Sequence, residues 1–397
     1  MPARVRATTQ HTGGKLHHGS SLALNSGGSL SGREPGNQPR RSALYRVAPR
    51  ALASLLIAAG FAWALQRGGL PFTPPSEAYA HLRWWGIPAF VVLTAVSVYL
   101  RTARWMYLLR PLCHDLVHWR VFGIGLVGFS AVFFAPLRLG EMVRPYLIAR
   151  DGEVTFVQAV GTVAAERIID GLVLVLLTAA AFGLSTPLSP LPNRVGALPI
   201  PVSLVPSTLL FATVLFTLAF LTMAAFYVAR EPARRLVKSV VGLVSERLAD
   251  FCSGLVERLA QGFAFLPSWK VSGPFMRDTL LYWCVGATAQ WALLWGVGLD
   301  PTPAQAFVAL GVIGLGSLLP AGPGFFGAYQ VATYTALAMF FPEQEVLTKG
   351  ALLVFARYSA HVTLSALASG LGFLLIARFP SNATTERLRP SLSSADA

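Results

Sequence analysis

The chain has 397 residues, of which 54% are hydrophobic and only 13% are charged. Soluble domains carry about 25% charged residues, so this composition excludes an ordinary soluble protein and indicates an integral membrane protein. The formal net charge of +14 at pH 7 suits nucleic acid, anionic lipid or cytoplasmic loops, and the positions of the charges decide between these. Cys113, Cys252 and Cys284 lie too far apart to indicate a metal site or a disulfide framework, and we expect no metal and no cofactor.

Both ends of the chain are predicted to be disordered. Residues 1–45 are rich in Gly, Ser and Arg and hold few large apolar side chains, so they cannot bury enough surface to offset the entropy lost on ordering. Residues 379–397 are predicted to be a disordered C-terminal tail. Residues 46–378 between the tails are predicted to form a polytopic transmembrane domain.

A helical span needs about 20 apolar residues to cross a membrane. Six full spans are predicted on this basis, over residues 50–66, 86–109, 158–184, 203–229, 279–299 and 350–378. Two further apolar stretches are interrupted. Residues 121–137 end at Pro136-Leu137-Arg138, and prolines and glycines break residues 303–341 near 319–324. We therefore expect an all-α integral membrane protein with about six full spans and two re-entrant or broken hairpins.

The basic residues predict the orientation of these segments, because Lys and Arg concentrate in short cytoplasmic loops. The segments rich in them are 1–50, 101–120, 138–155, 230–278 and 378–397, and the segments poor in them are 67–85, 185–202, 300–303 and 342–349. Placing every rich segment inside requires residues 121–150 to enter and leave on the cytoplasmic side. It also requires residues 303–341 to begin and end outside. Both termini are then cytoplasmic, and nucleic-acid binding is not expected, since the basic residues follow the loops.

The same topology suggests an inverted repeat. Residues 86–109, a broken hairpin and residues 158–184 have one orientation, and residues 279–299, a second broken hairpin and residues 350–378 have the opposite one. Two similar units of inverted topology are typical of many secondary transporters.

Residues 233–263 are predicted to form an amphipathic cytoplasmic helix. Apolar residues recur there at spacings of three and four, and Arg234, Arg235 and Lys238 contribute to a charged surface. Such a helix lies on the inner leaflet, where anionic lipid would favour it, or packs on its own bundle. A solvated connecting helix is the plainer alternative.

The first hairpin ends in a charged motif. Non-helical backbone at membrane depth is tolerated only where protein or a water-filled cavity covers it, so a break inside an apolar run predicts a cavity. Pro136 and Gly140 let the chain turn, Arg138 and Arg144 could bind a phosphate, and Glu141 could orient an arginine or bind a cationic head group. The alternative is that these residues are ordinary charged residues of a cytoplasmic loop.

Glu166, Arg167 and Asp170 lie inside the predicted span 158–184. Charges at membrane depth cost a few kcal/mol each and need partners. Arg167 and Asp170 are neighbours at i,i+3 on one helical face, and Glu166 and Asp170 are neighbours at i,i+4. One carboxylate remains in excess, so a further arginine or the substrate must neutralise it.

The second break contains Pro323, Gly324 and Gly327, and the two glycines permit a close backbone approach or a positive φ. A loop between two short spans is the alternative. Arg357 follows within the last apolar run, where a lone arginine is hard to explain without a partner. His361 alone is more often an interior histidine with satisfied hydrogen bonds than a proton carrier.

At these motifs the chain resembles the transmembrane region of the lysylphosphatidylglycerol synthase family, also called the flippase-like or UPF0104 family. The shared motifs are Arg101–Arg104–Trp105, Pro136-x-Arg138-x-Gly140-Glu141-x-x-Arg144, Glu166-Arg167-x-x-Asp170 and Pro323-Gly324-x-x-Gly327. Their order and spacing fit over roughly residues 50–378. The chain has Gln330 where the family often has an acid, which argues against a carboxylate role at that position.

The resemblance implies an inner-membrane protein of bacteria or archaea that handles lipids or lipid-linked glycans. Full-length synthases carry an additional soluble aminoacyl-transferase domain. This chain ends shortly after Arg378, so we expect no lysyl transfer by it, whatever the family name.

The leading hypothesis is a non-enzymatic, flippase-like protein that binds or translocates the head group of a phospholipid or lipid-linked glycan. The substrate-binding residues in this hypothesis are Arg138, Glu141, Arg144, Glu166, Arg167, Asp170 and Arg357, in a groove lined by the breaks at Pro136, Gly140, Pro323, Gly324 and Gly327. One alternative is a membrane accessory subunit of lipid aminoacylation or of an envelope glycosyltransferase pathway. Another is an intramembrane lipid-modifying enzyme, for which the sequence offers no nucleophile beside a base. The expected partners are anionic or lipid-linked membrane lipids, with a homo-oligomer or an envelope-biosynthesis partner left open.

Overall fold

The computed structural model describes residues 40–381 except 72, 153, 244 and 320, and the side chains of a few further residues in this range lie outside the description. Within this part of the chain the secondary structure is helical, with one isolated bridge between Val195 and Leu198. Residues from Arg46 onward form one compact unit. The predicted tails, 1–45 and 379–397, fall mostly outside the described residues.

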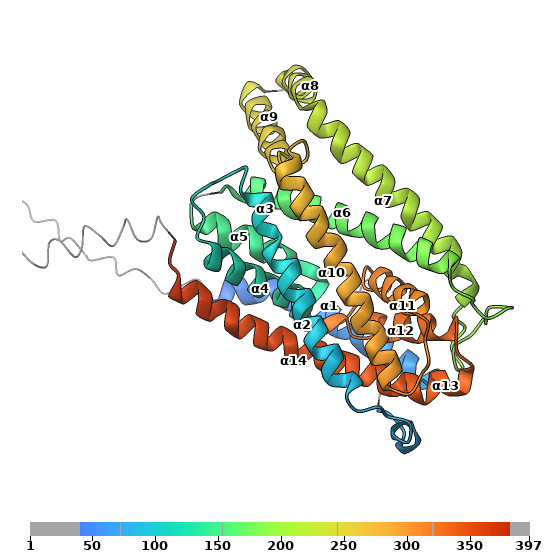
Figure 1. The fold of residues 1–397 in the computed structure, drawn as a ribbon. Coiled ribbons are helices and arrows are strands. Elements are labelled where there is room, and N and C mark those ends of the chain that lie inside the picture. Colours follow the sequence, from blue (N-terminus) through green and yellow to red (C-terminus); the bar gives the residue numbers. More distant parts are fainter. Residues whose placement is uncertain (1–39, 72, 153, 244, 320, 382–397) are drawn as a thin grey trace, which may run out of the picture. The chain divides into compact units, whose positions relative to one another are not determined.

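Helices occupy each of the six segments that were predicted to be full spans (Figure 1). They are α1 (Arg40–Arg67), α2 (Gly86–Ala103) continued by α3 (Trp105–Leu109), α6 (Phe156–Gly183), α7 (Val205–Val228), α10 (Trp269–Gly296) and α14 (Lys349–Arg378). By length and apolar composition, the stretches Gly86–Leu109, Val202–Val228 and Glu343–Arg378 are candidate membrane spans. α6 and α10 have 28 residues each, or about 42 Å, but both carry charged residues.

Both interrupted stretches form two helical arms around a break. The first consists of α4 (His118–Phe134), the 3-10 turn η2 (Pro136–Met142) and α5 (Val143–Arg150). The second consists of α11 (Pro303–Gly316), η4 (Pro323–Phe325) and α12 (Ala328–Ala338). Gly324 and Gly327 have φ angles of 70° and 91°, a region that only glycine adopts at low cost, so the chain can reverse here.

The helices of the two halves are interleaved. α2 packs along α10, α4 packs along α14, and α6 packs along α11. One large apolar core joins α10, α11, α12 and α14 to α2. A second joins α3, α4, α5 and α6 to α7, α10 and the turn that follows α9. Each broken hairpin therefore lies against the long helix of the opposite half.

Residues 233–263 form two helices, α8 (Arg230–Gly242) and α9 (Glu246–Gln261), and not the single helix that was predicted. α8 and α9 pack against each other, and Lys238 pairs with Asp250 at 3.0 Å across them. The break between the two helices has a local cause. The Ser245 hydroxyl accepts a hydrogen bond from the Leu248 amide, as an N-cap does, and a new helix, α9, begins there. The apolar periodicity continues through this turn, which hid it from sequence analysis.

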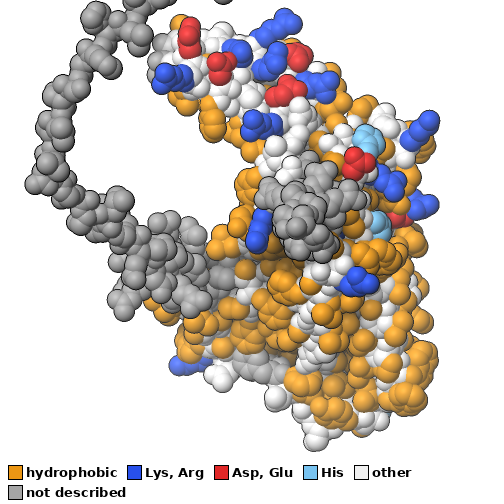
Figure 2. All heavy atoms as spheres, turned by 90° about the vertical axis from the view of Figure 1, so that its left-hand side faces the viewer, with side chains coloured by type: hydrophobic (Ala, Val, Ile, Leu, Met, Phe, Trp, Pro, Cys, Tyr) orange, Lys and Arg blue, Asp and Glu red, His pale blue; other side chains and the backbone are white. Residues whose placement is uncertain are grey.

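Charged side chains gather at the end of the molecule that carries α8 and α9, beside a broad hydrophobic surface (Figure 2). Large apolar residues are exposed on both helices and in the turn between them, and they include Leu236, Leu243 and Phe251. α7, which directly precedes α8, has only three buried residues and carries exposed large apolar side chains.

Candidate functional site

A buried network of five ionic side chains lies where α5 and α6 meet the junction of α2 and α3. Glu166 is at its centre, with one carboxylate oxygen 2.8 Å from Arg144 and the other 2.8 Å from Arg167 and 3.4 Å from Arg104. Arg104 also reaches Asp170 at 2.6 Å. Three arginines therefore neutralise two carboxylates, and one positive charge remains in excess.

Local sequence places each of these groups. Thr155 and Gln158 form a capping box that starts α6, and Glu166 and Asp170 then lie one turn apart on its buried face. Arg104 lies at the junction of α2 and α3, and its guanidinium also donates a 2.6 Å hydrogen bond to the Thr279 hydroxyl of α10.

Arg144 enters the network from α5, because the η2 turn brings α5 back against α4. Gly128 of α4 makes room for it, since a methyl group there would overlap the Arg144 side chain. Gly140 lies so close to the backbone of Ala131 that no side chain would fit. The turn at the first break therefore positions Arg144 beside Glu166.

Aromatic rings enclose the guanidinium groups. The Phe129 ring centroid lies 4.3 Å from Arg101, 4.2 Å from Arg144 and 5.7 Å from Arg167. Tyr282 faces both Arg101 and Arg104. Aromatic faces attract cations, most strongly where water is excluded, so these rings stabilise the arginines without neutralising them.

A cavity of about 540 Å³ opens beside this network. Arg101, Glu141, Arg167 and Asp170 line it on the side of the first half of the chain. The side chains that line it from the second half include Gln290, Tyr329, Arg357 and His361. The same cavity therefore has polar groups from both halves on otherwise apolar walls.

The structure brings most of the predicted site residues together. Arg144, Glu166, Arg167 and Asp170 form the network, and Glu141 and Arg357 reach the same cavity. The side chains of Arg138 and Pro136 lie outside the described residues.

We predicted that the groove is lined by Gly140, Pro323, Gly324 and Gly327. The structure corrects this prediction, because none of the four lines the cavity. The glycines pack against other parts of the protein: Gly140 on the backbone of α4, Gly324 near Tyr358 and Gly327 on Phe61. The neighbouring residues Glu141 and Phe325 line the cavity in their place. The breaks shape the cavity by turning the chain, and their neighbours form its surface.

Sequence reasoning did not assign a site role to Arg101, Arg104, Gln290 or Tyr329. Arg101 and Arg104 were visible as a pair at the end of an apolar run, and that signal could have placed them in the site. Gln290 is a single amide in the apolar helix α10, which is a weak signal.

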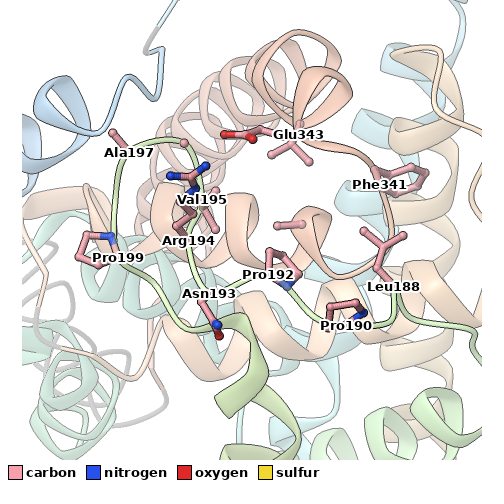
Figure 3. Close-up of a pocket in the computed structure, with 13 residues that line it drawn as sticks. Leu188, Pro190, Pro192, Asn193, Arg194, Val195, Ala197, Pro199, Phe341 and Glu343 are labelled. Atoms are coloured by element: carbon pink, nitrogen blue, oxygen red, sulfur yellow. The ribbon is translucent and has the colours of Figure 1, made fainter.

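A second hollow of similar volume, about 540 Å³, lies at the proline-rich segment 188–199 (Figure 3). The charged residues on its wall, Arg194 and Glu343, are both solvent-exposed. None of the predicted site residues lines it. The cavity beside Glu166 is therefore the candidate functional site.

Long apolar helices that enclose paired buried charges define a helical membrane protein. A family model described as "Lysylphosphatidylglycerol synthase TM region" matches residues 51–365. The chain belongs to this family, and the resemblance drawn from the motifs is confirmed.

The chain is also similar to the glycosyltransferase AglD of Haloferax volcanii, with 24% identity over 272 residues. The aligned region covers 64% of this chain and 43% of that relative, so the chain spans less than half of the relative's length. No solved structure matches the chain.

Proposed function

We propose that the protein binds the phosphate-bearing head group of a membrane lipid in the cavity beside Glu166 and moves it across the bilayer while the acyl chains stay in the membrane. The observation that carries this proposal is the excess of buried positive charge on a cavity bounded by both halves of the chain. Arg101 lines the cavity with no ion pair among the described residues, and Arg167 is 29% exposed toward it. An anionic head group would supply the missing negative charge.

The arrangement of the helices supports an inverted repeat. If α2, α4 and α6 correspond to α10, α11 and α14, then the packing of α4 on α14 corresponds to that of α11 on α6. A two-fold axis would exchange the two helices of the α2–α10 pair. Both breaks contain Pro-x-x-x-Gly, at 136–140 and 323–327, and each third helix carries polar residues four apart, Glu166 with Asp170 and Arg357 with His361. Rocking of one unit against the other would expose the cavity to each side in turn.

Two lipid classes fit this proposal, a phospholipid and a lipid-linked glycan, because both carry phosphate. The family name points to the first, and the relative named as a glycosyltransferase points to the second. The chain performs no covalent step in this proposal. Among the described residues no three His, Cys, Asp or Glu side chains gather as a metal centre would need.

The proposal also places the protein in the cytoplasmic membrane, with both termini and the α8–α9 hairpin inside. The basic loop segments support this orientation. Membrane lipids are its partners, and the basic residues of α8 favour the anionic ones.

Lipid scrambling by the purified protein in proteoliposomes tests the proposal. Fluorescent phosphatidylglycerol and a polyprenyl phosphate should both be assayed, and the wild type should accelerate the movement of at least one. Arg167→Gln should lower that rate about tenfold or more, because a charge-assisted hydrogen bond contributes roughly 1.5–3 kcal/mol. Arg83→Gln is the matched control, since Arg83 pairs with Asp300 away from the cavity.

A folded Arg167→Gln variant that moves lipid at the wild-type rate would contradict the assignment of the site. No acceleration of either lipid by the wild type, relative to protein-free liposomes, would overturn the proposed function.

A further inference from the structure

Arg357 lies on the wall of the cavity that is formed by the second half of the chain. It is 5% exposed, and its Nη1 donates a hydrogen bond to the Oε1 of Gln290 on α10. The Tyr329 ring of α12 faces its guanidinium, with the centroid 5.3 Å from the Cζ atom. All three side chains line the cavity.

Arg357 has different partners from the three arginines of the network around Glu166. Arg104, Arg144 and Arg167 each pair with a carboxylate. No ion pair joins Arg357 to an acid within the described part of the chain, and the neutral amide of Gln290 takes the place of one. A buried cation without a counter-charge costs several kcal/mol, so this position calls for an anion from outside the protein.

The unused hydrogen-bonding atoms point to the same kind of ligand. Arg357 Nε, Gln290 Nε2 and the Tyr329 hydroxyl are buried and have no hydrogen-bond partner among the residues described. The first two groups can only donate, and the hydroxyl can donate as well. Buried polar atoms are rarely left unpaired, and three donors, one of them on the cation itself, match the oxygens of an oxyanion.

We propose that Arg357, Gln290 and Tyr329 form a second phosphate-binding station in the cavity, separate from the network around Glu166. This inference rests on the proposed function and adds to it. The amide of Gln290 orients the guanidinium without neutralising it, and Tyr329 supplies a neutral donor. A lipid phosphate released from Arg101 and Arg167 on one wall would find this station on the wall of the other half.

Gln290→Glu tests the station with almost no change of shape. The new carboxylate keeps its contact with Arg357 but supplies the counter-charge that the lipid phosphate would otherwise provide. Binding is measured by native mass spectrometry on the full-length protein in detergent. The probes are phosphatidylglycerol, diacylglycerol as the phosphate-free lipid, and inorganic phosphate as a competitor.

The wild type should bind phosphatidylglycerol more tightly than diacylglycerol. Gln290→Glu should weaken phosphatidylglycerol binding about tenfold or more while raising the melting temperature. Tyr329→Phe should weaken it about threefold, because it removes one neutral donor. Gln344→Glu is the matched control, since Gln344 is exposed and lies outside the cavity.

Competition by inorganic phosphate would identify the free ion as a ligand, and failure to compete would identify lipid-borne phosphate as the ligand. Either outcome supports the station if Gln290→Glu loses phosphatidylglycerol binding. If the Gln290→Glu variant and the Tyr329→Phe variant both bind phosphatidylglycerol as tightly as the wild type does, the station is overturned. Equal affinity of the wild type for phosphatidylglycerol and diacylglycerol would also overturn it. The proposed function is judged separately. Lipid movement by the wild type, with wild-type binding in the station variants, removes only this station, whereas binding at the station without any movement removes only the transport.

Discussion

Glu166 shows how a fully buried carboxylate is held in an apolar environment. Its two oxygens contact three arginines, and the nearest of these pairs are 2.8 Å apart. Removing one partner from a buried pair costs about 3–5 kcal/mol, because the other charge is left uncompensated. The network is therefore sensitive to any change that moves one of its arginines.

Gly128 offers the most direct test of this sensitivity. A methyl group there would overlap the Arg144 side chain and displace it from Glu166. Gly128→Ala should lower the free energy of unfolding by about 3 kcal/mol, from overpacking and a weakened ion pair together. Denaturant unfolding in mixed micelles, followed by circular dichroism, measures the change.

Gly370 of α14 is the matched control, since a methyl group there would meet nothing within 4 Å. Gly370→Ala should leave the protein as stable as the wild type or stabilise it by up to about 1 kcal/mol, the difference in helix propensity. Equal effects of the two substitutions would argue that the position of Arg144 does not depend on Gly128.

The α8–α9 hairpin carries large apolar side chains that are mostly exposed in the described structure. Leu236, Leu243 and Phe251 are 64%, 88% and 69% exposed, and Arg234 and Arg235 lie on the same hairpin. The hairpin follows α7, which has the composition of a membrane span. Apolar and basic groups together favour the surface of an anionic membrane.

Hydrogen exchange in nanodiscs tests the placement of this hairpin. Backbone amides of residues 230–261 should exchange more slowly in phosphatidylglycerol than in phosphatidylcholine discs, since each basic residue contributes about 1 kcal/mol near an anionic surface. Neutralising Arg234, Arg235 and Lys238 with glutamine should remove the difference, whereas Arg194→Gln on the proline-rich segment should preserve it. The same exchange rate in both lipids would refute the placement.

At the scale of the whole molecule, the two hairpins decide the topology. If residues 121–150 return to the side on which they begin, positions 114 and 239 lie on the same side of the membrane. If the first hairpin crosses once, they lie on opposite sides. The distribution of Lys and Arg favours the first arrangement.

Cysteine labelling distinguishes these topologies. In a variant that lacks the native cysteines, His114→Cys and Ser239→Cys should react with an impermeant maleimide only after the cells are permeabilised. Thr186→Cys and Gln344→Cys should react in intact cells, because their segments carry few basic residues. All four positions are exposed at the protein surface, which makes their labelling comparable. Labelling of positions 114 and 239 from opposite sides would exclude a returning hairpin.

The sequence alone determined the class of protein and where the chain breaks. Long apolar runs become helices in a membrane because their backbone must bond internally, and Pro136 and Pro323 each lack one of the N–H groups that such bonding needs. The pairing of Arg167 with Asp170, which are 4.0 Å apart, was also predictable, since residues three apart share a helical face.

Only the tertiary structure decided which buried charges meet. Arg104 and Asp170 are 66 positions apart, and Arg357 and Gln290 are 67 apart. Helical periodicity carries no information about such distances, because they depend on how α2, α6, α10 and α14 pack. The sequence could therefore indicate that Glu166 and Arg357 need partners, but the fold selected three arginines for the first and an uncharged amide for the second.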